Sequence, residues 1–117
     1  MSVRRAERVG EAVRQVIAEL LLREIKDPRI GMITLTTVEL SDDLRHGKVY
    51  FSCVGDEGAR QRSLSGLRSA AGFIKAQVTR RLHLRYAPDL TFVFDSALEV
   101  ADRLSSLLKD AHPKKDE

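Results

Sequence analysis

The residues of this chain best suited to chemistry are cations gathered in one stretch. From Gly58 to Pro88 there are seven basic residues and neither an Asp nor a Glu. The rest of the chain holds the other 13 Lys and Arg and all 17 Asp and Glu, so the formal net charge of +3 conceals this segment. Cations concentrated on one ordered element attract a polyanion, above all the phosphates of nucleic acid. The seven are Arg60, Arg62, Arg68, Lys75, Arg80, Arg81 and Arg85.

A solvated helix face is the alternative explanation of this charge. Such faces usually mix both signs, whereas about thirty residues here lack one sign entirely. Arg68 and Lys75 are seven residues apart and fall on the same edge of a helix, while Arg62 and Arg80 point elsewhere. The pattern therefore favours a broad nucleic-acid-binding surface over a solvated face. Its candidate contacts are Arg68, Lys75, Arg80, Arg81 and Arg85.

A second basic cluster opens the chain, where Arg4, Arg5 and Arg8 fall in the first turns of a predicted helix. The N-terminal end of a helix already carries positive partial charge, so three arginines there are locally unfavourable. An anionic partner would offset that cost. Glu7 and Glu11 would also offset it, through pairs three or four residues apart. Both explanations remain open from the sequence.

The elements that must position these cations follow from hydrophobic spacing. Apolar residues at helical intervals predict a helix from Val3 to about Lys26, ended by Asp27-Pro28. Residues rich in Ile, Thr and Val predict strands over Met32–Leu40 and Lys48–Val54, which most simply form a hairpin around Ser41-Asp42-Asp43.

The basic segment itself has a helical pattern with a break. Leu64, Leu67, Ile74 and Val78 keep the spacing of one apolar face. Ala70-Ala71-Gly72 lies inside that pattern, and it predicts a kink or two short helices. A short buried strand over Leu90–Phe94 and a last helix from Ser96, capped by Glu99, complete the order α-β-β-α-kink-α-β-α.

The sequence gives catalysis and metal binding poor support. His46, His83 and His112 are far apart and near no cysteine or paired carboxylate. Cys53 shares its strand face with Val49 and Phe51, which favours a core role over a nucleophile. We therefore expect a protein that is not an enzyme and needs no cofactor or metal.

The run Gly55-Asp56-Glu57-Gly58 matches the G-x-x-G loop with which KH domains hold a nucleic-acid backbone. Its two carboxylates would repel phosphate, so we interpret it as a turn between a strand and a helix.

Length and composition indicate one globular domain, over residues 1–110, followed by a short disordered polar tail at 111–117. No apolar run approaches the ~20 residues of a membrane span. The lone cysteine, Cys53, favours a reducing compartment, so we expect a protein of the cytoplasm. We also expect a monomer.

Several motifs, in this order and spacing, resemble the ribosome-binding factor A family over nearly the whole chain. They are Arg4-Arg5-Ala6-Glu7-Arg8-Val9, Glu24-Ile25-Lys26-Asp27-Pro28-Arg29, Val38-Glu39-Leu40-Ser41-Asp42-Asp43-Leu44 with Lys48-Val49-Tyr50, Ala70-Ala71-Gly72, Leu82-His83-Leu84-Arg85-Tyr86-Ala87-Pro88 and Leu90-Thr91-Phe92.

The resemblance implies an α+β, type II KH-like domain, with a three-stranded sheet packed against helices. In the family an Ala-x-Gly kink replaces the G-x-x-G loop, and here that kink maps onto Ala70, Ala71 and Gly72. The resemblance further implies a small-subunit assembly factor that binds 16S rRNA in the free 30S subunit. It would assist late maturation, including in the cold, with other assembly factors or GTPases as candidate partners.

Two other functions remain compatible with the residues. One is a general KH-like nucleic-acid-binding module without a ribosomal role. The other is a protein-interaction adaptor whose basic face meets an acidic partner.

Overall fold

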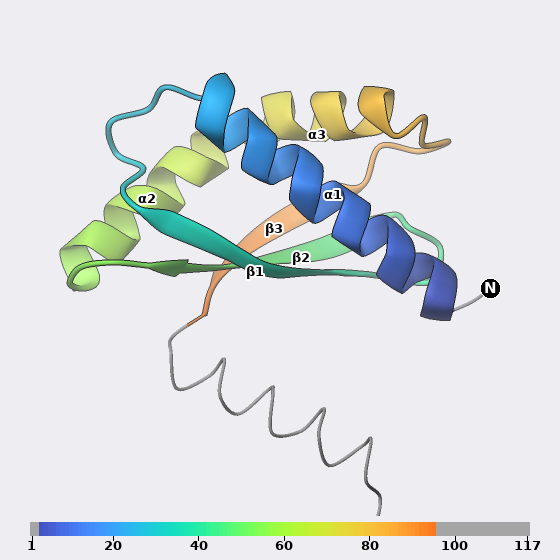
Figure 1. Ribbon diagram of the computed structural model, residues 1–117, viewed down its shortest axis with the longest axis horizontal. Helices are drawn as coiled ribbons and strands as arrows, with labels where there is room; N and C mark the ends of the chain where they lie inside the picture. Colours follow the sequence, from blue (N-terminus) through green and yellow to red (C-terminus); the bar gives the residue numbers. More distant parts are fainter. Residues whose placement is uncertain (1–2, 96–117) are drawn as a thin grey trace, which may run out of the picture.

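The computed structural model describes residues 3–95, in six elements (Figure 1). They are α1 (Val3–Arg23), β1 (Ile33–Leu40), β2 (His46–Cys53), α2 (Glu57–Ser69), α3 (Ala71–Arg81) and β3 (Asp89–Phe94). The predicted order is confirmed over this range, including the division of the basic segment into two helices. Three predicted features lie outside the described residues: the helix from Ser96 with its capping box of Ser96 and Glu99, the residue His112, and the tail at 111–117. The division at residue 110 therefore stays a prediction.

The three strands form one sheet in the order β1-β2-β3. The predicted hairpin is confirmed, since β1 pairs antiparallel with β2. Strand β3 runs parallel to β2, an arrangement that needs a crossover connection, which α2 and α3 supply. The β1–β2 register shifts between Leu35 and Thr37, so Thr36 drops out of the pairing. Its hydroxyl donates instead to Asp95 Oδ2, at 3.0 Å.

The expectation that the last strand is buried is wrong for most of its residues. Phe92 is buried, but Asp89 and Thr91 are exposed, and the remaining three residues are half-buried. The reason is that successive side chains of a strand point to opposite faces and the helices cover only one face of the sheet, so Asp89 and Thr91 lie on the uncovered face.

The three helices lie on the same side of the sheet and cover one of its faces (Figure 1). Val13, Ile17 and Leu20 of α1 are fully buried against the sheet and α3. Phe51 of β2 is also fully buried, and its ring meets that of Phe94 edge-on at 5.9 Å. The predicted apolar face of the basic segment is confirmed. Its Leu67, Ile74 and Val78 are fully buried, and Leu64, Ala71 and Leu82 pack around them.

Helix α1 ends at Arg23, three residues before the predicted end. Leu20 O accepts hydrogen bonds from the N–H groups of both Glu24 and Ile25, at 2.8 Å each, which closes the last turn. The chain then leaves the helix before Pro28, because a proline disfavours helical geometry in the residue that precedes it.

The loop after α1 is fastened onto α2. The Arg29 guanidinium donates to Ser69 Oγ at 3.0 Å and to Ser65 Oγ at 3.3 Å. Gly31 N donates to the buried hydroxyl of Ser63 at 3.1 Å. A methyl group at Gly66 would come within 2.6 Å of Ile30 Cγ1, so the close approach of loop and helix requires glycine there. These contacts fix α2 up to the residue before the helix break.

Candidate nucleic-acid interface

A single residue, Ala70, separates the two helices of the basic segment. It ends α2 and begins α3, with φ −89° and ψ −1°. Its N–H is shared between Gly66 O and Leu67 O, each 3.1 Å away, and its carbonyl accepts from Ile74 N at 2.9 Å. The break falls at the start of the run Ala70-Ala71-Gly72. The predicted kink is therefore confirmed at the predicted place.

Gly72, in the first turn of α3, faces open space. No atom lies within 4 Å of the position that a side chain would occupy, and the fold does not require glycine there. The first turn of α3 contains no acidic residue, and no side chain caps it. The positive end of this helix therefore lies beside an unobstructed stretch of main chain.

Three of the predicted cations on the helix pair and its following loop are exposed. Arg68 lies in the last turn of α2, Arg80 in the last turn of α3, and Arg85 in the loop before β3. Arg80 donates to Gln77 Oε1 at 2.9 Å, a neutral acceptor that leaves its charge uncompensated. These arginines present cationic groups to solvent at both ends of α3.

The other two predicted cations meet carboxylates from outside the acid-free stretch. Lys75 Nζ lies 2.7 Å from Asp89 Oδ1, and this ammonium holds the pKa of Asp89 below its usual value. Arg81 bridges two glutamates of α1's C-terminal end, with 3.2 Å to Glu19 Oε1 and 2.8 Å to Glu24 Oε2. Both cations are half-buried, so the cationic surface is smaller in space than in sequence.

The start of the segment is also partly neutralised. Arg60 pairs with Glu57 one turn earlier and lies over the ring of Phe94, with 4.4 Å from Cζ to the ring centroid. Arg62 is exposed on the same helix.

Arg4, Arg5 and Arg8 are exposed on the first two turns of α1. Of the two acids expected to compensate them, Glu11 is committed to Arg14, at 2.6 Å, and this hydrogen-bonded pair lowers the pKa of Glu11. The start of α1 lies toward the β1–β2 turn, since a side chain at Gly10 would meet Val38 O at 2.6 Å. The structure therefore separates these arginines from the helix break. It brings them to the hairpin end, by which we mean the end of the molecule at the β1–β2 turn, residues 41–45 (Figure 1).

The hairpin end also holds residues that sequence reasoning missed. Arg45, in the β1–β2 turn, stacks on the ring of Tyr86, with 3.8 Å from Cζ to the ring centroid. Arg85 approaches the same ring at 5.8 Å. Arg45 and Tyr86 are 41 positions apart, and no local spacing signals their contact.

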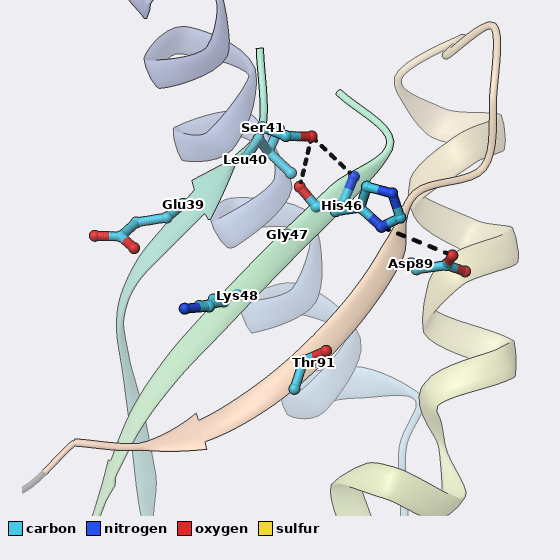
Figure 2. Close-up of a pocket in the computed structure, with 8 residues that line it drawn as sticks. All are labelled: Glu39, Leu40, Ser41, His46, Gly47, Lys48, Asp89 and Thr91. Atoms are coloured by element: carbon cyan, nitrogen blue, oxygen red, sulfur yellow. Dashed lines mark hydrogen bonds and ion pairs between the residues drawn. The ribbon is translucent and has the colours of Figure 1, made fainter. Parts of the chain in front are cut away.

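A shallow depression of about 360 Å³ lies across the strands at this end (Figure 2). Lys48 lies between Glu39 and Thr91 on the three strands, and His46 Nδ1 lies 3.9 Å from Asp89 Oδ2. Acidic and basic groups alternate here, so this depression lacks the single sign of charge that a phosphate site needs.

The predicted structural role of Gly55-Asp56-Glu57-Gly58 agrees with the geometry. Gly55 has φ +125°, a conformation that favours glycine, and Asp56 is the N-cap of α2. The Asp56 carboxylate accepts from Ala59 N at 2.9 Å, which lowers the pKa of Asp56. These carboxylates face the positive end of their own helix.

Among residues 3–95, no three His, Cys, Asp or Glu side chains are arranged to hold a metal ion. Cys53 is half-buried against the core, 3.6 Å from Ser63 Oγ, and Asp42 and Asp43 lie exposed in the hairpin turn. None of the helices in this range is long and apolar enough to cross a membrane.

The order of the elements defines an α+β, KH-like domain. A helix precedes a hairpin, two helices separated by Ala70 follow, and the third strand runs parallel to the second. The helix pair of this domain carries the exposed arginines and the open glycine, where KH domains of the G-x-x-G type carry their nucleic-acid loop.

Comparisons with known proteins place the chain within this class. The family model of ribosome-binding factor A matches residues 5–108. Ribosome-binding factor A of Geobacter metallireducens is 41% identical over 107 residues, which cover 92% of this chain and 91% of the relative. That of Syntrophobacter fumaroxidans is 42% identical and covers 96% and 97% of the two chains. The chain belongs to the ribosome-binding factor A family.

Solved structures give the same fold. The crystal structure of ribosome-binding factor A from Thermus thermophilus is 26% identical and superposes with a TM-score of 0.65, over 75% of this chain and 93% of that one. A homology model of the Thermus factor, fitted into a cryo-electron-microscopy map of its complex with the 30S subunit, is 28% identical. Its TM-score is 0.60, over 74% and 91% of the two chains.

Proposed function

We propose that this protein is a small-subunit assembly factor that binds 16S rRNA in the free 30S subunit and assists its late maturation, including at low temperature. The observation that carries the proposal is the exposed cationic helix pair, in a chain of the ribosome-binding factor A family. The fitted complex of the Thermus relative with the 30S subunit supports the choice of subunit. The action is one of binding, in the cytoplasm and as a monomer, and needs neither catalysis nor a cofactor.

The arginines explain how such binding would work. Arg68 lies beside the helix break and Arg80 in the last turn of α3, so their guanidinium groups, near the two ends of α3, reach phosphates about one helix length apart. The open main chain at Gly72 admits the backbone of RNA between them. At the hairpin end, Arg85 and the arginines of the first turns of α1 would extend the contact; the latter are Arg4, Arg5 and Arg8. Lys75 and Arg81 would bind phosphate only after they release the carboxylates with which they pair.

Recognition by phosphate position suits a structured RNA. Aromatic residues make up only 5% of the chain, so base stacking contributes little. RNA shape and the spacing of phosphates would then select the site. Other assembly factors or GTPases are further candidate partners.

Sedimentation tests the proposal. A tagged copy of the chain is followed through a gradient of cell lysate at low and moderate salt. Comigration with free small subunits, and not with large subunits or 70S particles, is the expected result. A protein that remains at the top of the gradient at low salt contradicts the proposal. Comigration with every RNA-containing fraction would instead indicate a general nucleic-acid-binding module.

The doubly substituted Arg68→Ala/Arg80→Ala chain supplies the site-specific version of this test, and it should shift toward the top of the gradient. Arg23→Ala removes another exposed arginine, which lies outside the helix pair at the end of α1, and is the matched control.

A further inference from the structure

At the hairpin end, two arginines from different segments share one aromatic ring. Arg45 belongs to the β1–β2 turn, and Arg85 and Tyr86 belong to the loop between α3 and β3. A hydrogen bond from Asp89 N, at the start of β3 just after this loop, to Arg45 O at 2.8 Å holds the two segments together. The 3.8 Å distance from Arg45 Cζ to the Tyr86 ring centroid places the guanidinium in contact with the ring.

Both arginines remain available to a ligand. Arg45 and Arg85 are exposed, and neither forms an ion pair within residues 3–95. In the same turn, Asp43 Oδ1 accepts from the Ser41 hydroxyl at 2.7 Å and from Arg45 N at 3.0 Å, and not from the Arg45 guanidinium. Tyr86 is 48% exposed, which is unusual for a ring that only fills the core.

A guanidinium contacting an aromatic ring is held in place, yet it keeps its N–H groups for other acceptors. A phosphodiester offers two oxygens that such a planar group binds bidentately. Because the ring has already restricted the arginine, binding loses less side-chain entropy than it would with a free arginine. Stacking on Tyr86 therefore prepares Arg45 for phosphate without neutralising it.

We infer that Arg45 and Arg85, aligned by Tyr86, form a second contact for RNA backbone phosphate at the hairpin end of the molecule. This inference rests on the proposed function and adds two residues, Arg45 and Tyr86, that lie outside the helix break. The 11 residues of α3 separate this contact from the break, a distance of about 16 Å. Tyr86 is a positioning residue, and Arg45 makes the contact.

The test measures binding of the full chain to purified free small subunits, with single-stranded poly(U) RNA as a second probe, over a series of salt concentrations. Arg45→Ala should weaken binding and reduce the slope of log K against log salt by roughly 0.7–0.9, the value for one lost phosphate contact. Arg23→Ala, the exposed arginine at the end of α1, should bind as the wild type does.

Two substitutions of Tyr86 separate positioning from packing. Tyr86→Leu keeps an apolar side chain but removes the ring, and should weaken binding about 2- to 10-fold with little change of slope, because both charges remain. Tyr86→Phe keeps the ring and should restore wild-type affinity. In an Arg45→Ala background, Tyr86→Leu should cost less than it does alone. Circular dichroism of each variant establishes that the fold is intact.

The outcomes separate this inference from the proposed function. A wild-type chain that binds small subunits, with Arg45→Ala equal to it in affinity and slope, overturns the inference and leaves the function standing. Equal loss in Tyr86→Leu and Tyr86→Phe overturns the positioning role. A wild-type chain that binds neither subunits nor poly(U) overturns both.

Discussion

Lys75 Nζ contacts Asp89 Oδ1 at 2.7 Å, which joins the middle of α3 to the first residue of β3. The lysine belongs to the stretch without acidic residues, and the aspartate is the first acid that follows it. The fold therefore places a carboxylate beside α3, a helix that itself contains no acidic residue. RNA that reaches Lys75 must displace this carboxylate, so the ion pair opposes binding at that position.

Removal of this competitor should strengthen RNA binding. Asp89→Asn keeps the size of the side chain and its hydrogen-bonding capacity but abolishes the charge. We expect affinity for small subunits to rise about two- to fivefold, in keeping with the modest strength of an exposed ion pair, and the salt slope to become steeper. The gain should vanish in a Lys75→Ala background. An equal gain in that background would mean that Asp89 acts by general repulsion and that Lys75 does not contact RNA.

Arg68 and Arg81 should respond differently to truncation. Arg68 is exposed and forms no ion pair within residues 3–95, so Arg68→Ala should flatten the salt slope by roughly 0.7–0.9 with little change in melting temperature. Arg81 is half-buried between Glu19 and Glu24, so Arg81→Ala should lower the melting temperature and flatten the slope less. Salt-dependent binding and thermal unfolding, measured on both variants, check this ranking. The reverse ranking would contradict it.

Substitutions of Gly66 and Gly72, two glycines of the helix pair, should have opposite effects on the stability of the fold. Both lie in helices, where Ala is favoured over Gly by ~1 kcal/mol. Gly72→Ala places its methyl group in open space and should raise the free energy of unfolding by up to that amount. It should also weaken RNA binding, because in the proposed complex the RNA backbone approaches the main chain there. Gly66→Ala meets Ile30 Cγ1 at 2.6 Å and should lower stability by about 1–3 kcal/mol.

Denaturant unfolding and subunit binding of the two glycine variants are the measurements. Gly72→Val extends the test, because a larger group at the same open position should weaken binding further. Wild-type binding by both Gly72 variants would remove the glycine from the interface.

The sequence predicted most of the fold because its signals are local. Helical spacing, Asp27-Pro28 and the small residues at 70–72 each act within one or two turns, and the structure places the corresponding helices and the break accordingly. The charge pattern was a poorer guide, since the partners of Lys75 and Arg81 are supplied by topology. Glu19 lies 62 positions before Arg81, and only the packing of α1 beside α3 brings them together.

The same limit explains two further differences. Leu90–Phe94 has the composition of a buried strand, but composition does not say whether both faces of the sheet are covered, and here the helices cover only one. The stacking of Arg45 on Tyr86 depends on two turns meeting at one end of the sheet, and each residue alone looks like an ordinary exposed residue of a loop.

Acid should weaken the contacts between Asp27 and Arg29, and with them the attachment of the α1–β1 loop to α2. Hydrogen bonds from the Arg29 side chain and from its N–H hold the pKa of Asp27 below its usual value. A carboxyl group whose pKa is lower in the folded state contributes stability above its unfolded pKa, and loses it as pH falls through the folded one. The contribution of Asp27 should therefore be complete above about pH 5 and decline from about pH 4 downward. Unfolding of Asp27→Asn should depend less on pH in that window than unfolding of the wild type.

An unchanged acid dependence in Asp27→Asn would assign the acid lability to other carboxyl groups. Asp43, for example, has its pKa lowered by the Ser41 hydroxyl and the N–H of Arg45.

The Gly55-Asp56-Glu57-Gly58 turn should support folding and take no part in binding. Asp56→Ala removes the side chain that caps α2 through Ala59 N, so the melting temperature should fall by a few degrees, while Asp56→Asn retains the cap and most of the stability. Neither variant should weaken RNA binding at a temperature where it is folded. Loss of a carboxylate beside a cationic surface should, if anything, strengthen it. Weaker binding by folded Asp56→Asn would show instead that this turn contacts RNA, as the G-x-x-G loop does in other KH domains.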